Sequence, residues 1–192
     1  MTPVFLEKIS IHNDWQQFLT MPNLNLLAKI EQQVLVQNYT PAEDKVLRFL
    51  GFPLRQSKII ILGQDPYPQK GVATGRAFEV GNLKSWNDSF RNTSLKNILR
   101  ALYRANHGEI IKYSYLKEKL GSDFPVLPPG ELFSHWEKQG VLLLNTSFTC
   151  EIGSPGSHSK TWSEFTNRLL TYINKTAPKV IWFLWGNHAI KA

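Results

Sequence analysis

The sequence predicts an α/β fold with a mainly parallel sheet, and two observations carry this prediction. Three short apolar runs, at residues 58–62, 141–144 and 180–185, are typical of strands that are buried on both faces. Segments with apolar residues at helical spacing lie between these runs, and this alternation favours parallel strands joined by helices. Because no repeat, low-complexity tract or linker interrupts the pattern, we expect a single domain over residues 1–192.

Two helices are predicted before the first strand. Residues 23–36 place apolar side chains at helical spacing, which is typical of an amphipathic helix. The segment Thr40-Pro41-Ala42-Glu43 has the form of a capping box with proline at the first helical position. We expect the helix that it begins to run to about Leu50 and to stop at Gly51.

The region between the first and second strands is predicted to be mixed. Residues 77–80 are expected to form a short extended piece. Ser94 is expected to cap a helix, because an apolar stripe at helical spacing follows it. Residues 106–129 have a weaker pattern, so we expect a long charged connection with a short helix near 115–120.

The last part of the chain is predicted to continue the alternation. Residues 131–138 are expected to form a short helix that ends at Gly140, directly before the second strand. Thr161-Trp162-Ser163-Glu164 has the form of another capping box at the start of an amphipathic helix. After the third strand, we expect Gly186-Asn187 to open one more helix.

Charge and cysteine usage limit the possible functions. The 192 residues carry a net charge of +7, and the sequence pI is about 9.5. Such a balance favours a polyanionic partner such as nucleic acid, although many basic proteins bind none. Cys150 is the only cysteine, which excludes an intrachain disulfide and a cysteine-based zinc site and fits a reducing, cytoplasmic compartment. We expect neither a signal peptide nor a transmembrane span.

Several common catalytic signatures are absent from the sequence. Gly71 and Gly75 do not have the spacing of a phosphate-binding loop and are followed by Arg76. The patterns G-x-G-x-x-G, H-E-x-x-H and G-x-S-x-G do not occur. Nucleotide hydrolysis, dinucleotide binding, zinc proteolysis and an elbow-type serine hydrolase therefore lack their signatures.

The remaining candidates are polar or aromatic residues near predicted strand ends, where sites form in open α/β sheets. Each of them alone has an ordinary structural explanation. Asp65 suits a turn, and Asn145 suits a strand end. Tyr67 and Phe78 suit a core, and Ser94 suits a helix N-cap. A function therefore depends on their combination.

The combination resembles the uracil-DNA glycosylase family. The segments GQDPYP, AFEV, SLKNIL, GVLLLNTSFT, SHSKTWSEFT and VIWFLWGNHA match the family's motif series in order and at compatible spacings. The resemblance runs from about Thr40 to the end of the sequence. It implies a three-layer α/β/α domain with a central, mainly parallel sheet of about four strands. It also implies a DNA repair enzyme that hydrolyses the N-glycosidic bond of uracil and leaves an abasic site.

The resemblance also implies roles for five residues. Asp65 would orient or activate the attacking water and stabilise the oxocarbenium-like sugar. Tyr67 would exclude the 5-methyl group of thymine, and Phe78 would stack on uracil. Asn145 would donate to O4 and accept from N3–H, a pattern that cytosine reverses. Gln64 would line the pocket through its backbone.

DNA is the partner that the resemblance implies. Ser94, near a helix start, and Asn187 would contact phosphates. We expect uracil-containing DNA as the substrate, no metal or other cofactor, no membrane and a monomer. The basic charge then has a role in holding phosphates.

The resemblance leaves one large gap at the carboxyl end. Past the strand that matches residues 180–185, the family continues into a helix, another strand and an H-P-S-P-L motif. That motif supplies a histidine for the departing uracil and a leucine wedge. This sequence ends at Ala192 without it, and we interpret His188 as a local residue. The abrupt end favours truncation of a longer product, with the last strand missing, over a natural short variant with weak or no activity.

Smaller departures concern the DNA contacts and the pocket loop. Pro68 stands where many relatives have histidine, residues 91–93 replace a proline-rich loop, and Asn187 replaces a serine. Thr74 and Arg76 are atypical within the pocket loop. Two alternative functions therefore stay open. The absent H-P-S-P-L segment leaves open a non-catalytic nucleic-acid or uracil-binding protein on the same fold, and the pocket-loop changes leave open a glycosylase with altered base choice.

Overall fold

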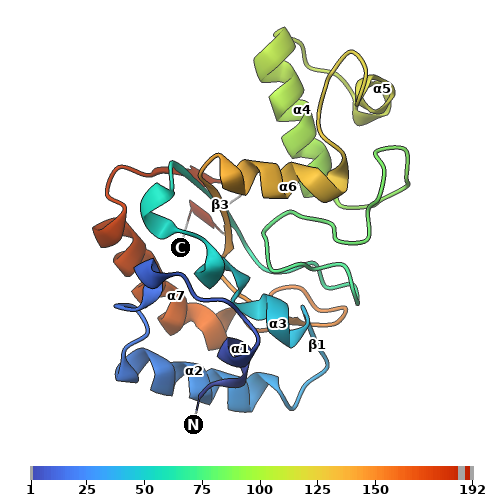
Figure 1. Cartoon of the computed structure of the whole chain (residues 1–192). Coiled ribbons are helices and arrows are strands. Elements are labelled where there is room, and N and C mark those ends of the chain that lie inside the picture. The colour runs from blue at the N-terminus through green and yellow to red at the C-terminus, as the bar shows by residue number, and fades with distance from the viewer. Residues whose placement is uncertain (1, 186–188, 191–192) are drawn as a thin grey trace.

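A central parallel sheet organises the chain in a computed structural model that describes residues 2–185 and 189–190 (Figure 1). Its strands are β2 (Ile59–Gly63), β3 (Val141–Asn145) and β5 (Ile181–Leu184), in the order β3-β2-β5. Both neighbours run parallel to β2, and the register pairs Gly63 with Asn145. The predicted parallel α/β sheet is thereby confirmed, and its three strands match the three apolar runs.

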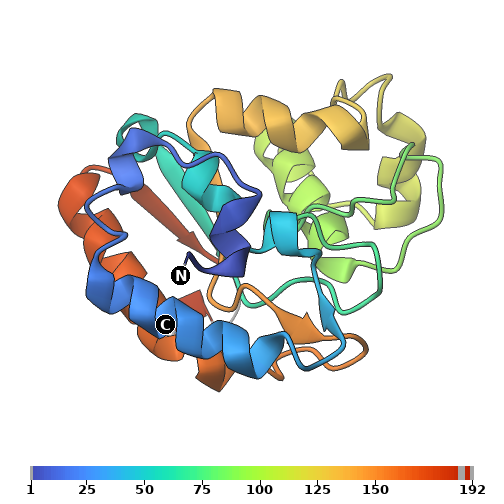
Figure 2. The ribbon, with the colours of Figure 1, turned by 60° about the horizontal axis from the view of Figure 1, so that its bottom comes forward.

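Two helical layers cover the two faces of this sheet (Figures 1 and 2). On one face lie α2 (Met21–Val34) and α7 (Ser159–Thr176). On the other lie α4 (Thr93–His107), α5 (Tyr113–Lys119) and α6 (Pro129–Lys138). The three-layer architecture is therefore confirmed, as is the short helix within the long connection. Among the described residues, no helix is both long and apolar enough to cross a membrane.

Alternating side chains of the sheet build two separate cores. Ile60 and Leu62 join the core under α2 and α7, together with the matching residues of β3. Ile61 and Leu143 join the core under α4, α5 and α6. A side chain changes face at each step along a strand, so both faces of β2 and β3 are apolar.

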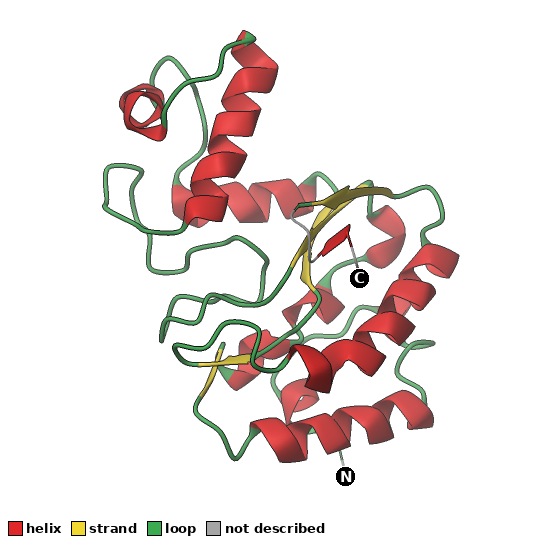
Figure 3. Cartoon of the chain, turned by 180° about the vertical axis from the view of Figure 1, so that it is seen from behind, coloured by secondary structure: helices red, strands yellow, loops and turns green. Residues whose placement is uncertain are grey.

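The remaining elements are short. The helical turns are α1 (Val4–Glu7), α3 (Glu43–Val46) and the 3₁₀ turns η1 (Asn13–Trp15), η2 (Arg48–Gly51) and η3 (Leu54–Gln56). The strands β1 (Tyr39–Thr40) and β4 (Cys150–Glu151) form a small antiparallel sheet. Figure 3 shows this sheet on the same side of the molecule as the long loop between β2 and α4.

Three predicted helix starts are wrong. The helix expected from Thr40 to Leu50 is broken into α3 and η2, because Thr40 is paired with Cys150 in an extended conformation. The helix α4 begins at Thr93 and is preceded by Asn92, so Ser94 lies inside the first turn and is not its N-cap. The helix α7 begins at Ser159, and Thr161 is likewise already helical. Tertiary pairing and packing overrode the local capping patterns at these positions.

Two further predictions are corrected by the structure. Residues 77–80 form no strand, because Phe78 has a left-handed φ of 67°. The third strand is not buried on both faces, since Ile181 is 61% exposed and Phe183 is 40% exposed. Within the described residues β5 pairs only with β2 and forms an edge of the sheet. The helix expected at Gly186-Asn187 begins outside the described residues.

Candidate active site

The carboxyl ends of β2 and β3 open into a cavity of about 580 Å³. Because the two strands are parallel and in register, the turns that follow them start side by side at Gly63 and Asn145. The cavity is lined by Gln64, Asp65, Pro66, Tyr67, Pro68, Phe78, Ser94, Asn145, Pro155 and Trp185. Six of the seven predicted site residues therefore lie around one cavity, and the seventh, Asn187, lies outside the described residues.

The turn after β2 is fixed to the turn after β3 through the backbone of Gln64. The Gln64 carbonyl accepts hydrogen bonds from Thr146 N at 3.1 Å, Thr146 Oγ1 at 2.8 Å and Ser147 N at 2.9 Å. Its side chain is exposed. The carbonyl therefore holds the two turns together, while the rest of Gln64 borders the cavity.

Asp65 is held at the rim of the cavity, half-buried and hydrogen bonded. The backbone N–H of Gly156 donates to Asp65 Oδ2. The buried thiol of Cys150 donates to the carbonyl of the next residue, Pro66, at 3.4 Å. Burial and the nearby Asp65 charge together raise the pKa of the Cys150 thiol to about 12. The thiol therefore stays protonated and acts as an anchor of the turn, not as a nucleophile.

Tyr67 and Phe78 form the aromatic side of the cavity. The Tyr67 hydroxyl donates to the Phe78 carbonyl at 3.3 Å. Burial raises the pKa of Tyr67, against a smaller opposing effect of a hydrogen bond with Asn92, so the phenol stays neutral and keeps its donor. The Phe78 ring meets Trp185 edge to face, with 5.7 Å between ring centroids.

Asn145 places an amide at the inner end of the cavity. It is only 5% exposed, although it ends a strand. It lines the cavity, so its amide can face a bound group. A buried amide of this kind favours a ligand that offers one acceptor and one donor side by side.

Ser94 lies at the outer edge, in the first turn of α4. Its side chain is exposed, and the N-terminal turn of this 15-residue helix presents free backbone N–H groups. Such a helix start favours an anionic group. Ser94 is thus placed toward solvent, away from the buried amide.

Sequence reasoning missed Trp185, Pro155 and Gly156. Trp185 directly follows β5, so the strand-end argument used for Asp65 and Asn145 applied to it equally. The whole run at residues 180–185 is apolar, which is typical of a buried strand and gives no sign of a site residue at its end. Gly156 acts through its backbone N–H, which leaves no signal in side-chain chemistry.

The arrangement suits recognition of a small planar polar ring and attack next to it. Phe78 offers a face for stacking, Asn145 a hydrogen-bonding edge, and Tyr67 a wall. Asp65 supplies a carboxylate that can act on a water molecule or stabilise positive charge. The four residues together supply these functions, and no one of them supplies them all.

Comparisons with known proteins point to one family. The family model described as "Uracil DNA glycosylase superfamily" matches residues 51–192. "Uracil-DNA glycosylase 1" of Listeria monocytogenes is 33% identical over 185 residues, which cover 93% of this chain and 74% of that protein. "Uracil-DNA glycosylase" of Fusobacterium nucleatum is 33% identical over 189 residues, covering 93% and 73%.

Solved structures give the same result for the fold. The crystal structure of mimivirus uracil-DNA glycosylase is 26% identical, with a TM-score of 0.69 over 94% of this chain. This chain spans 63% of that protein's length. A Nitratifractor salsuginis structure is 23% identical with a TM-score of 0.71, covers 94% of this chain and 77% of its own, and supports the fold alone.

Proposed function

The chain belongs to the uracil-DNA glycosylase superfamily, whose function is uracil excision in DNA repair, and we propose that the strand-end cavity is where it removes uracil. The target bond is inaccessible inside a duplex, so the uracil nucleotide must first be flipped into the cavity. Water then adds to C1′ of the deoxyribose and loses a proton, while the bond from C1′ to N1 breaks and its electron pair leaves with uracil, which ends with that proton. The products are free uracil and an abasic site.

Asp65 is the proposed catalytic residue. Its carboxylate would orient the attacking water and stabilise the positive charge that develops on the sugar. The hydrogen bond from Gly156 supports this role, because it fixes Asp65 Oδ2 and leaves the geometry of the carboxylate set before the substrate arrives.

Asn145, Phe78 and Tyr67 are proposed to recognise the base. The Asn145 amide would donate to O4 and accept from N3–H, whereas cytosine would leave buried groups unpaired. Phe78 would stack on the uracil ring, and Tyr67 would overlap the methyl group of thymine. Their support is that all three line the cavity that also contains Asp65.

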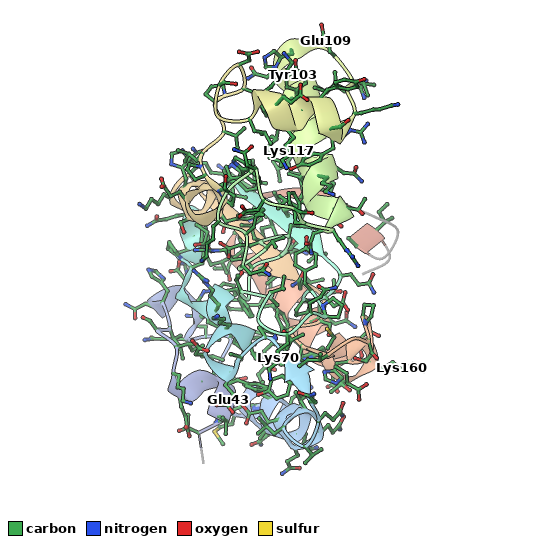
Figure 4. The ribbon with its side chains drawn as sticks, turned by 90° about the vertical axis from the view of Figure 1, so that its right-hand side faces the viewer. Glu43, Lys70, Tyr103, Glu109, Lys117 and Lys160 are labelled. Carbon is green, nitrogen blue, oxygen red and sulfur yellow. The ribbon has the colours of Figure 1, made fainter. Side chains whose placement is uncertain are left out.

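DNA would be held by positive charge around this cavity. Lys70 lies two residues after the turn that carries Asp65, and Lys160 lies in the first turn of α7; both are exposed (Figure 4). Ser94 and Gln64 border the cavity, Ser94 as a phosphate contact and Gln64 as part of the pocket wall. Asn187, the second expected phosphate contact, lies outside the described residues. With a net charge of +7, DNA binding should weaken steeply with salt.

The observation that carries the proposal is the meeting of Asp65 and Asn145 at one cavity in a chain of this family. The test measures release of uracil from a uracil-containing oligonucleotide by the wild-type chain and by Asp65→Asn. We expect the variant to lose at least about a hundredfold in rate, since the charge at C1′ is gone. Asp88→Asn, on an exposed loop, is the matched control and should keep full activity.

Equal rates for Asp65→Asn and the wild type would refute the assignment of Asp65. Binding of uracil-containing DNA by the wild type without release would favour the non-catalytic alternative, and preference for another damaged base would favour altered base choice.

The proposal also includes a monomer that works in the cytoplasm. The lone cysteine supports the location, because a chain with a single cysteine is consistent with a reducing compartment.

A further inference from the structure

Phe78 has a backbone conformation that needs support from its surroundings. Its φ of 67° is the only positive φ of a residue other than glycine in the described part of the chain. A bulky residue in this region is strained and persists only where neighbouring structure holds it. Contacts of the residues on either side of Phe78 must therefore stabilise this conformation.

An ion pair closes across Phe78. Arg76 Nη1 donates to Glu79 Oε1 at 3.0 Å and to Oε2 at 3.1 Å. The Arg76 side chain is 7% exposed and the Glu79 side chain 11% exposed, so the pair is largely shielded from water. Because the two partners flank Ala77 and Phe78, their contact fixes the ends of the short segment that carries the ring.

The pair is anchored to α6. Arg76 Nη2 donates to Glu137 Oε2 at 2.5 Å and to Ser134 Oγ at 3.3 Å. Thr74 Oγ1 donates to Glu79 Oε2 at 2.5 Å, which holds the second carboxylate oxygen. The carboxylates of Glu79 and Glu137 raise the pKa of Arg76 against the opposing effect of burial, so the guanidinium stays charged.

The backbone around the segment is fixed at three further points. Ala77 N donates to the Leu143 carbonyl of β3 at 3.4 Å, and Gly81 N donates to the Val72 carbonyl at 2.8 Å. The Phe78 carbonyl accepts from the Tyr67 hydroxyl at 3.3 Å. These bonds place the loop on β3, on residue 72 and on Tyr67, and the pair of Arg76 and Glu79 spans the two residues between them.

We propose that Arg76 and Glu79 are positioning residues for Phe78, and that their ion pair, anchored to α6 by Glu137, fixes the Phe78 ring in the site cavity. That the ring stacks on uracil rests on the proposed function; that the pair fixes the ring does not. The inference also explains why two charged residues are buried in a loop beside an apolar core, at a desolvation cost that a purely structural contact seldom repays.

The experiment compares three variants with the wild-type chain. Arg76→Met with Glu79→Gln removes both charges and keeps the side-chain volumes, so no buried charge is left without a partner within the pair. Arg76→Lys keeps the charge but replaces the two-pronged contact by a point contact. Arg168→Met with Glu164→Gln is the matched control, because that Arg–Glu pair is exposed on α7.

Two measurements follow the ring and the loop separately. The first gives KM, kcat and the inhibition constant of free uracil on a uracil-containing oligonucleotide. The second gives amide hydrogen exchange in residues 72–81, with the β2 amides as internal reference, and needs no activity. Thermal unfolding of each variant checks that it folds.

For the double variant, we expect KM and the uracil inhibition constant to rise about tenfold, with kcat changed less than about threefold, because stacking contributes to ground-state binding. Exchange in residues 72–81 should quicken, while exchange in β2 stays the same. Arg76→Lys should fall between the double variant and the wild type, and the control should match the wild type.

An unchanged inhibition constant and unchanged loop exchange in the double variant would overturn the proposal. Should the double variant not fold, Glu137→Gln tests the anchor instead, since its side chain is 25% exposed and can stay solvated. It should raise the same constants by about twofold to threefold, and no effect on them or on exchange would overturn the proposal. Absence of uracil release by the wild type would overturn the proposed function, while exchange still decides the role of the pair.

Discussion

Asn145 occupies the space in which a side chain at Gly63 would begin. The two residues end adjacent parallel strands and are paired in register. A Cβ atom built on Gly63 would lie 2.5 Å from Asn145 Oδ1, 3.1 Å from Ala77 Cβ and 3.3 Å from Phe78 Cζ. The absence of a side chain at position 63 thus lets the Asn145 amide and the Phe78 ring approach the same strand end.

Gly63→Ala is predicted to impair base reading more than folding. The new methyl group must displace the Asn145 amide, because contacts under 3.0 Å are not tolerated. We expect kcat/KM for uracil release to fall at least about a hundredfold, as expected when a hydrogen-bonding edge is misplaced. The free energy of unfolding should fall by only about 1–3 kcal/mol. Steady-state kinetics and urea unfolding measure the two effects.

Gly130→Ala provides the matched control for that prediction. A Cβ atom there would meet nothing within 4 Å, and Gly130 lies in the first turn of α6. It should leave kcat/KM unchanged and not destabilise the fold. Wild-type kinetics for Gly63→Ala would contradict the close packing of Asn145 against β2.

Tyr67→Ala is predicted to relax discrimination against thymine. Removing the ring opens the wall next to Asp65, so a 5-methyl group should fit. We expect measurable release of thymine from a thymine-containing oligonucleotide, together with a loss of about 3–5 kcal/mol of stability from the vacated volume. Tyr67→Phe keeps the bulk and loses only the bond to the Phe78 carbonyl, so it should still reject thymine. Thymine release by both variants, or by neither, would contradict the steric role.

The sequence allowed the sheet to be predicted because local pattern and tertiary position agree there. The run Ile60–Leu62 is buried between the two helical layers, and the strand-end argument placed Asp65 and Asn145 at the same edge. The capping box at Thr40 failed because Thr40 is engaged in a strand pair with Cys150, which lies far away in the sequence. Pairing between distant segments leaves no mark in a local capping pattern.

The extended piece expected around Phe78 failed for a related reason. Its left-handed φ accompanies an ion pair between Arg76 and Glu79 and an anchor at Glu137, and no local propensity signals that combination. The place of Phe78 at the cavity agrees with the prediction from the family motif, whereas the contacts that surround it were not predictable. Structure was needed to see that the atypical charge at Arg76 is paired with Glu79 and Glu137.

Trp185→Leu is predicted to weaken binding of the base through Phe78. The two rings pack edge to face with centroids 5.7 Å apart, and such a pair contributes about 0.5–1.5 kcal/mol. We expect KM to rise by about twofold to tenfold at nearly constant kcat. Trp185→Phe retains an aromatic edge and should stay within about twofold of the wild type. Steady-state kinetics of both variants measures these KM values. An equal rise in KM for Trp185→Leu and Trp185→Phe would mean that Trp185 does not act through its edge-to-face contact with Phe78.

His158 is predicted to make stability depend on pH. It is 3% exposed, and its ring nitrogens bond to Thr149 Oγ1 and to Gln37 Oε1, each at 2.8 Å. Burial lowers the pKa of His158 below its usual 6.5, against a smaller opposing effect of Glu151. As the pH falls through 6.5, the unfolded chain therefore takes up a proton at His158 before the folded chain does. The free energy of unfolding should consequently be highest above that pH and fall below it.

His158→Gln isolates this contribution. The variant cannot titrate at position 158, so its stability should decline less than that of the wild type between about pH 8 and about pH 5.5. Glu31, whose pKa is raised by burial, acts in the opposite direction, because a raised carboxyl pKa adds stability as the pH falls. It is present in both proteins, so its effect cancels in the comparison. Urea unfolding across this range measures both slopes, and equal slopes would mean that His158 does not titrate differently in the folded and unfolded chains.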